Sequence, residues 1–200
     1  MKIIEIAGII GVFSVIGLTL RRKQPQHSSS LDAETIGDYF NRGLHGFIFK
    51  LSNGKVLKIV SMGIGDVKFG WRDANNKQSN FIDEYIQNTK SGKWEECKVL
   101  PKYYYYNEGY ANQELLDELE DEGDTDWDID YNDEVAAWVT DDYNTIDVKS
   151  LTETEVLRAK TVLHGWGVNY GVTFGDLHDD NYGIDENGGI VFFDFSVNMQ

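Results

Sequence analysis

The sequence predicts an α+β fold in which short antiparallel strands alternate with a few helices. Three observations carry this prediction. Asn-Gly pairs separate apolar runs at 53–54 and 187–188, a strong hairpin signal because both central residues of such a tight turn need positive φ. Helical apolar spacing occurs in 77–89 and 153–164. Hydrophobic residues make up 41% of the 200 residues and aromatic residues 13%, which is enough for a globular domain with a core.

Charge and cysteine content narrow the range of partners. The net charge of −16 disfavours nucleic acid and anionic membrane surfaces as partners of the soluble part, because both repel an acidic protein. Cys97 is the single cysteine, so an internal disulfide framework is excluded and a reducing, cytosolic location is acceptable.

The N-terminal residues predict a membrane anchor. Residues 3–20 are nearly all apolar and are followed by the basic residues 21–23. About twenty apolar residues span a bilayer as a helix, and basic residues stay on the cytoplasmic side. We therefore expect a hydrophobic helix over 1–23 that leaves the rest of the chain in the cytoplasm. The alternatives are a helix buried against a partner protein and a cleaved signal peptide, whose basic residues would precede its apolar run.

A linker and three strands follow. Residues 24–33 are polar, with a proline and a serine run, which is typical of a linker. Residues 36–60 indicate three strands joined by a glycine-containing turn at Gly43 and Gly46 and by the turn at 53–54. Lys58 lies between apolar neighbours in the third strand, where an unpaired ammonium group would be costly.

The middle of the chain predicts a helix, a strand, an insertion and another strand. Residues 77–89 carry one apolar face, and 98–107, with four successive tyrosines, read as a strand. Residues 111–134 form an acidic insertion, best interpreted as solvated, with binding to a basic partner as the alternative. A calcium loop at 124–128 is excluded, because the glycine and the bidentate glutamate that it requires are missing. Residues 134–139 form the following strand.

A second helix begins with a recognisable cap. Thr152 and Glu155 form a capping box, with Leu151 and Val156 as the hydrophobic staple. We expect Val156, Ala159 and Leu163 to be buried, and Gly165 to end the helix in the left-handed conformation.

Residues 172–196 carry the chemistry. Two apolar runs, Tyr182 to Ile184 and Ile190 to Phe193, flank the Asn-Gly pair at 187–188. Asp176 and Asn181 precede this hairpin and Asp194 follows it. Because a hairpin brings its two ends together, the three side chains should converge on one spot, and such oxygen ligands suit Mg²⁺, which then binds a phosphate chain.

This pattern resembles that of the protein-kinase-like phosphotransferases. The chain reads Asp176-x-x-x-x-Asn181, a hairpin, and then Asp194-Phe195-Ser196, with the family's spacings of five and thirteen residues. The segment Gly-Asp-Leu-His resembles the corresponding motif of the aminoglycoside and choline kinases more than that of typical protein kinases. The resemblance covers about residues 34–196. It implies a protein-kinase-like domain over 34–200, with an antiparallel-sheet N-lobe (34–140) and a minimal, truncated C-lobe (141–200).

Three departures from the family are visible. Phe174 stands where the family has a histidine before Gly-Asp, and Ser196 replaces the glycine of Asp-Phe-Gly. Only five residues follow Phe195, so the activation segment and the remaining C-lobe helices of the family have no counterpart in this sequence.

The resemblance implies a role for each candidate residue. Lys58 would hold the α- and β-phosphates of ATP and pair with a helix glutamate, for which we select Glu84, with Asp83 and Glu95 as alternatives. Asp176 would accept the proton of the attacking hydroxyl. The other assigned roles are covering the phosphates for Gly43 and Gly46, reading the adenine from a hinge that includes Asp142, and binding Mg²⁺ for Asn181 and Asp194.

The function expected from the sequence is ATP- and Mg²⁺-dependent phosphoryl transfer to a hydroxyl group of a protein Ser or Thr or of a small molecule. The alternative is a non-catalytic pseudokinase or structural subunit. In that case a protein partner would cover the truncated C-lobe through the exposed face of the helix at 153–164.

Overall fold

The computed structural model describes residues 36–43, 46–51, 54–62, 71–111, 129, 132–143 and 150–200. They fall into two compact units, one comprising residues up to Asn75 with Tyr104–Thr140, and the other comprising Asn76–Tyr103 with Asp141–Gln200. The predicted N-terminal helix, the linker and most of the acidic insertion lie outside the described residues. Among the helices that are described, none is long and apolar enough to cross a membrane.

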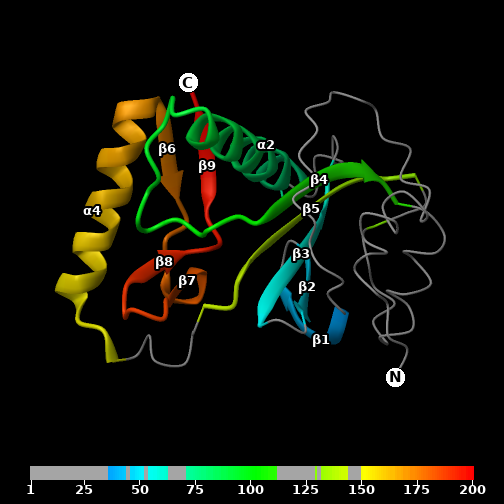
Figure 1. Ribbon diagram of the computed structural model, residues 1–200, viewed down its shortest axis with the longest axis horizontal. Helices are drawn as coiled ribbons and strands as arrows, with labels where there is room; N and C mark the ends of the chain where they lie inside the picture. Colours follow the sequence, from blue (N-terminus) through cyan, green and yellow to red (C-terminus); the bar gives the residue numbers. More distant parts are fainter. Residues whose placement is uncertain are drawn as a thin grey trace. The chain divides into compact units, whose positions relative to one another are not determined.

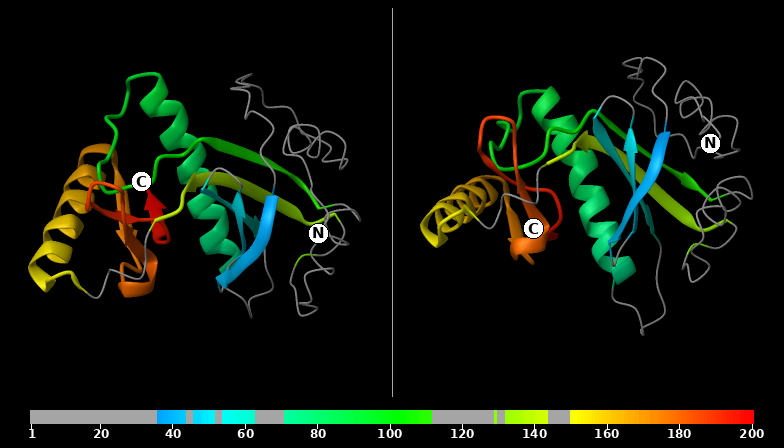
Figure 2. Two further views of the ribbon diagram at one scale, coloured as in Figure 1. Left: turned by 60° about the horizontal axis from the view of Figure 1, so that its bottom comes forward. Right: turned by 90° about the horizontal axis from the view of Figure 1, so that it is seen from below.

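The first unit is built on one five-stranded sheet, whose strand order is β1-β2-β3-β5-β4 (Figure 1). The β1-β2, β2-β3 and β4-β5 pairs are antiparallel. Figure 2 shows how strongly the sheet twists. The predicted strands at 36–60 and 134–139 are confirmed. The strands are β1 (Ile36–Gly43), β2 (Gly46–Leu51), β3 (Lys55–Ser61), β4 (Tyr105–Tyr110) and β5 (Glu134–Asp141).

The predicted strand at 98–107 is wrong over its first half, since β4 begins only at Tyr105. Pro101 has no backbone N–H to give to a ladder. The neighbouring backbone groups are used elsewhere, because Val99 O accepts from Phe192 N at 2.9 Å and Lys102 N donates to the Tyr143 hydroxyl at 3.0 Å. The aromatic and β-branched composition signalled extended backbone, but not where pairing begins.

Helix α2 (Trp71–Lys90) begins six residues before the predicted helix at 77–89. The first turns were missed because they lack the apolar repeat that marks the rest. Their anchor is polar instead: Asn75 is buried, and its Nδ2 donates to Ser61 O at the end of β3, at 2.8 Å. A hydrogen bond of this kind leaves no periodic signal in a sequence.

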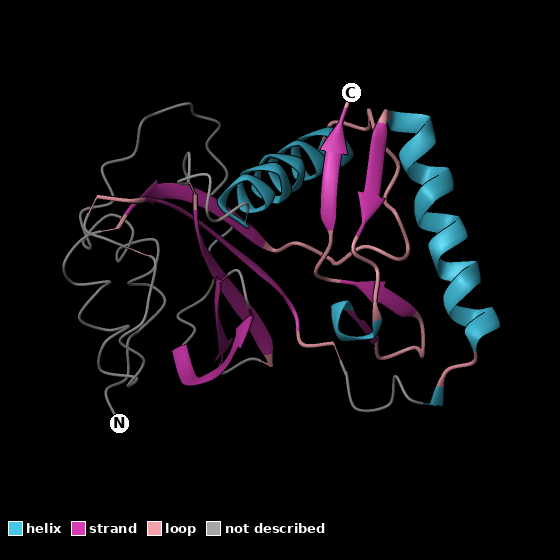
Figure 3. Ribbon diagram, turned by 180° about the vertical axis from the view of Figure 1, so that it is seen from behind, coloured by secondary structure: helices cyan, strands magenta, loops and turns pink. Residues whose placement is uncertain are grey.

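The second unit combines helix α4 with two small antiparallel sheets. One sheet pairs β6 with β9, and the other pairs β7 with β8. Figure 3 shows β6 and β9 side by side, with α4 running alongside β6. The bounds are α4 (Glu153–Tyr170), β6 (Val172–Gly175), β7 (Tyr182–Ile184), β8 (Ile190–Phe192) and β9 (Ser196–Met199).

The predicted cap of α4 is confirmed, and its predicted end at Gly165 is wrong. Glu155 N donates to Thr152 Oγ1, and Thr152 N donates to Glu155 Oε2, which closes the capping box. The helix continues to Gly171, which takes the left-handed conformation with φ 71°. Gly165 stays helical because burial of Trp166, the next residue, stabilises the helix beyond it.

The core of the second unit is aromatic and is centred on Phe81 of α2. Its ring makes edge contacts with Trp166 of α4, Phe174 of β6 and Phe195, at centroid distances of 6.2, 5.3 and 5.7 Å. Phe174 and Phe195 also contact each other, at 5.4 Å. This cluster joins helices and strands from distant parts of the sequence, and it fixes the backbone on either side of the loop that follows β6.

Candidate functional site

The β7-β8 hairpin positions the candidate residues, and its turn differs from the prediction. Gly188 alone has positive φ, at 80°, so Asn187 does not adopt the predicted left-handed conformation. The connection is longer than a two-residue turn. Gly188 N donates to Asp185 O, and the Asp185 carboxylate accepts from the amides of Asn187 and Gly189. The hairpin itself is confirmed, with Tyr182 opposite Phe192.

Asn181 joins the two ends of this hairpin. Its carbonyl oxygen accepts from Phe193 N at 3.1 Å and from Asp194 N at 3.2 Å. The residue is buried at the end of a single 3₁₀ turn over Asp179–Asn181. The Asp179 carboxylate accepts from the Tyr182 hydroxyl at 3.0 Å, which ties the turn to the start of β7. The backbones that carry Asn181 and Asp194 are therefore held together directly.

Asp176 is held against Asn181 from the other side. Its carbonyl oxygen accepts from Asn181 Nδ2 at 2.6 Å. Asp176 has φ 59°, in the left-handed region that non-glycine residues seldom adopt. Backbone strain of this kind is often kept at functional sites. The structure thus brings Asp176, Asn181 and Asp194 together, as the hairpin argument requires.

The Asp176 side chain is available for chemistry. It is 52% exposed, and its Oδ1 lies 3.2 Å from His178 Nε2. His178 is similarly exposed, at 57%, and its ring nitrogen also lies 3.2 Å from Asn181 Nδ2. The loop from Asp176 to Asn181 is therefore ordered by its own polar side chains, while the Asp176 carboxylate faces outward.

Asp194 is bound by a residue that the sequence did not single out. Gln78 of α2 is buried, and its Nε2 donates to Asp194 Oδ1 at 3.4 Å. Tyr103 lies in the same environment: burial raises the pKa of its phenol well above the ordinary value, and the Asp194 carboxylate adds to that shift. Among the described residues, its hydroxyl is a buried polar atom without a hydrogen-bond partner.

The donor set fits a hard divalent cation. Asn181 offers an amide oxygen and Asp194 offers carboxylate oxygens. Because Asn181 Nδ2 donates to Asp176 O, the amide oxygen of Asn181 is directed away from that carbonyl group. The described residues contain no group of three His, Cys, Asp or Glu that could hold a metal. Two protein ligands are nevertheless sufficient for Mg²⁺, which keeps several waters and takes phosphate oxygens.

Lys58 belongs to the first unit. It is buried on β3, and its ammonium group lies 5.5 Å from the centre of the Trp138 ring, within the distance of a cation–π contact. Gly46, opposite Gly43 in the β1-β2 pair, is needed for packing. A Cβ added to Gly46 would lie 2.5 Å from Ile59 O, so the fold alone explains this glycine.

The remaining candidates are exposed or have other contacts. Glu84 is exposed on α2, and so is Glu95 in the following loop, while Asp83 accepts a hydrogen bond from Gln87 at 2.7 Å. Asp142 is exposed directly after β5. The pairing of Lys58 with Glu84 and the hinge role of Asp142 remain predictions.

Comparison with solved structures identifies the class of fold. The structure of vaccinia related kinase 3 matches over 92% of this chain, with a TM-score of 0.50 and 11% sequence identity. The chain spans 54% of the length of that kinase. No protein-family model and no curated protein matches the sequence. The chain therefore has a protein-kinase-like fold, with an antiparallel sheet, α2 and α4 as its described parts.

Proposed function

We propose that this protein is an ATP- and Mg²⁺-dependent phosphotransferase that acts on a hydroxyl group of a protein or of a small molecule. The observation that carries the proposal is the hydrogen-bonded set of Asp176, Asn181 and Asp194 in a protein-kinase-like fold. The order and spacing of these residues are those of the kinase pattern, and oxygen ligands next to an exposed carboxylate suit phosphoryl transfer.

Each residue has a role in this proposal. Asp176 accepts the proton of the attacking hydroxyl, for which its exposed carboxylate is suited. Asn181 and Asp194 hold Mg²⁺ through side-chain oxygens, and Lys58 supplies positive charge to the phosphates. Bound Mg²⁺ would neutralise the charge that develops on the phosphate oxygens.

The test is ATP turnover by the purified full chain with Mg²⁺ and candidate acceptors. Asp176→Asn should lower the rate by about 10²–10⁴-fold, the usual contribution of a positioned general base. Asp180→Asn is the matched control, because Asp180 is an exposed carboxylate of the same loop, and it should leave the rate unchanged. Equal rates for Asp176→Asn and the wild type would contradict the assigned chemistry.

One observation favours a second candidate, a non-catalytic module that binds a protein partner. On α4, Leu157 is 65% exposed and Val168 is 81% exposed. These residues are eleven apart, or about three helical turns, and so lie on the same face. A partner that covers this face would bury both side chains. Thermal shift with ATP, with and without Mg²⁺, tests this candidate, because a protein that binds nucleotide gains stability by mass action. No shift at saturating MgATP would exclude both the enzyme and a nucleotide-binding pseudokinase and leave a structural role.

A further inference from the structure

Gln78 is an unusual residue to find inside this unit. It is 3% exposed on the buried side of α2, next to Ser79, which is fully buried. A buried primary amide loses its hydrogen bonds to water, which costs free energy unless other partners replace them. Leucine or methionine would fill such a position on a helix without that cost. The amide therefore needs an explanation beyond packing.

The partner of this amide is a candidate metal ligand. Gln78 Nε2 donates to Asp194 Oδ1 at 3.4 Å. Phe81, one turn further along α2, packs against Phe195 at a centroid distance of 5.7 Å. Residues three apart lie on the same helix face, so one face of α2 binds two consecutive residues of the loop after β8. One of these contacts is apolar and fixes the backbone, and the other is polar and reaches the carboxylate.

An amide is well suited to orienting this carboxylate. The amide is a neutral donor that binds one oxygen of Asp194. A lysine or arginine at this position would compete with a metal ion for the carboxylate, and a glutamate would repel it. An ionised carboxylate has about four lone-pair sites on its two oxygens, so a single amide donor on Oδ1 can orient the group that a cation binds. Groups that hydrogen-bond a metal ligand fix its orientation, and removing them commonly weakens metal binding by about 10–100-fold.

We propose that Gln78 is a positioning residue that orients the Asp194 carboxylate for a divalent cation bound together with a nucleotide. This inference rests on the proposed function, because it needs Asp194 to be a cation ligand. It also assigns α2 a functional contact different from the predicted one. Glu84, selected from the sequence, is exposed, whereas the buried Gln78 donates to Asp194.

The experiment measures cation and nucleotide binding separately on the full chain, by thermal shift and calorimetry. ATP affinity is measured first without metal, and MgCl₂ or MnCl₂ is then titrated at fixed ATP. Gln78→Met removes the amide and keeps the length of the side chain. It should raise the half-saturating metal concentration by about tenfold and leave metal-free ATP affinity unchanged. A purely structural defect would weaken both together.

Two further variants make the result decisive. Gln87→Met is the matched control, because Gln87 is an exposed glutamine of the same helix that bonds Asp83, and it should bind metal as the wild type does. Gln78→Asn keeps a polar amide in the same environment but is one methylene too short to reach Asp194, so it should show the same loss. It serves as the test if Gln78→Met does not fold.

The outcomes distinguish the two proposals. If the wild type binds ATP with a clear metal dependence and both Gln78 variants keep the same half-saturation, the positioning role is wrong and the proposed function stands. If the wild type shows no metal-dependent nucleotide binding, the proposed function fails and the inference fails with it. A metal-specific loss in Gln78→Met or Gln78→Asn, absent in Gln87→Met, supports both.

Discussion

Helices α2 and α4 depart from the simple amphipathic pattern in opposite ways. Helix α2 buries the polar residues Asn75, Gln78 and Ser79, whereas α4 exposes the apolar residues Leu157, Val162 and Val168. Buried polar groups and exposed apolar groups are the informative exceptions in a folded protein. On α2 the exceptions have partners inside the protein, and on α4 they face outward.

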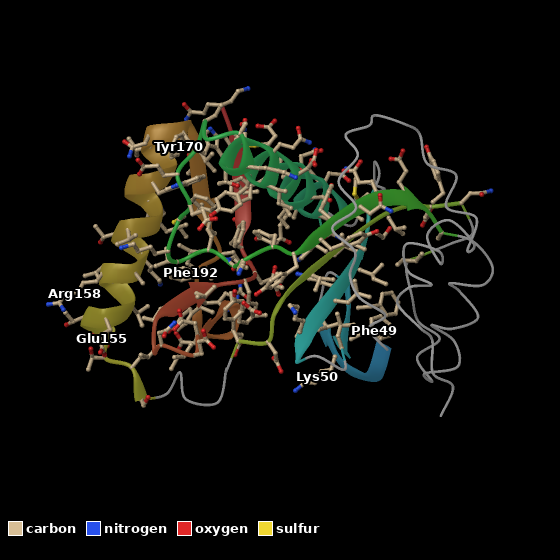
Figure 4. All side chains as sticks on the ribbon, viewed as in Figure 1. Phe49, Lys50, Glu155, Arg158, Tyr170 and Phe192 are labelled. Carbon is tan, nitrogen blue, oxygen red and sulfur yellow. The ribbon has the colours of Figure 1, made fainter. Side chains whose placement is uncertain are left out.

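This difference between the two helices indicates which interactions stabilise each of them. Part of the buried face of α2 makes specific hydrogen bonds. Asn75 donates to Ser61 O within the first unit, and Gln78 donates to Asp194 within the second. Helix α4 is held by a narrow apolar stripe and by its own capping box; Figure 4 shows Glu155 at one end of the helix and Tyr170 at the other. Substitutions on the two helices should therefore have very different effects, and four predictions test this.

The largest effect is expected on α2. Phe81→Ala removes a fully buried ring that contacts aromatic residues of three other segments. It should lower the free energy of unfolding by about 3–5 kcal/mol, measured by urea denaturation. Asn80→Ala, at an exposed position next to it, should stay within about 0.5 kcal/mol of the wild type. Similar losses for both variants would mean that the helix does not pack through Phe81.

A smaller contrast is expected along α4. Leu163 is fully buried and Leu157 is mostly exposed, although both are leucines on the same helix. Leu163→Ala should cost about 2–5 kcal/mol, and Leu157→Ala should change stability by at most about 0.5 kcal/mol, each measured by urea denaturation. If Leu157→Ala proves as costly as Leu163→Ala, then α4 buries its outer face in solution and the comparison between the helices fails.

The two glycines inside α4 should respond with opposite signs. A Cβ at Gly167 would lie 2.3 Å from Val172 O, whereas a Cβ at Gly165 would meet nothing within 4 Å. Gly167→Ala should therefore destabilise the protein by about 1–3 kcal/mol through overpacking. Gly165→Ala should stabilise it by about 0.5–1 kcal/mol, because alanine restricts the unfolded chain. Melting temperatures of the two variants, on either side of the wild type, provide the measurement.

The sequence predicted most elements because local signals mark them. The first three strands, the β7-β8 hairpin and the capping box of α4 each depend on residues close together in the chain. The candidate triad of Asp176, Asn181 and Asp194 could be predicted for the same reason, since one hairpin brings its members together. The protein-kinase-like fold followed from the spacing of these residues.

What the sequence could not provide depends on distant residues. The predicted start of β4 and the predicted end of α4 at Gly165 were wrong, because hydrogen bonds and burial contributed by other segments decide where these elements begin and end. Gln78 was missed because its partner, Asp194, is 116 residues away. A glutamine in a polar helix segment has no local signature, and a buried polar contact of this kind becomes visible only in three dimensions.

The smallest effect concerns the cap of α4 and depends on pH. Hydrogen bonds from the Thr152 side chain and backbone lower the pKa of Glu155 below its ordinary value of 4.5. A lowered pKa in the folded state means that the stabilisation is present above pH 4.5 and is lost as pH falls through the folded pKa. Glu155→Gln should therefore lower the urea midpoint slightly at pH 7, and the gap to the wild type should close in acid. Glu153→Gln, in the same first turn, controls for the helix dipole. A Glu155→Gln gap that does not narrow at any pH below 4.5 would show that the capping carboxylate does not stabilise α4 as an ion.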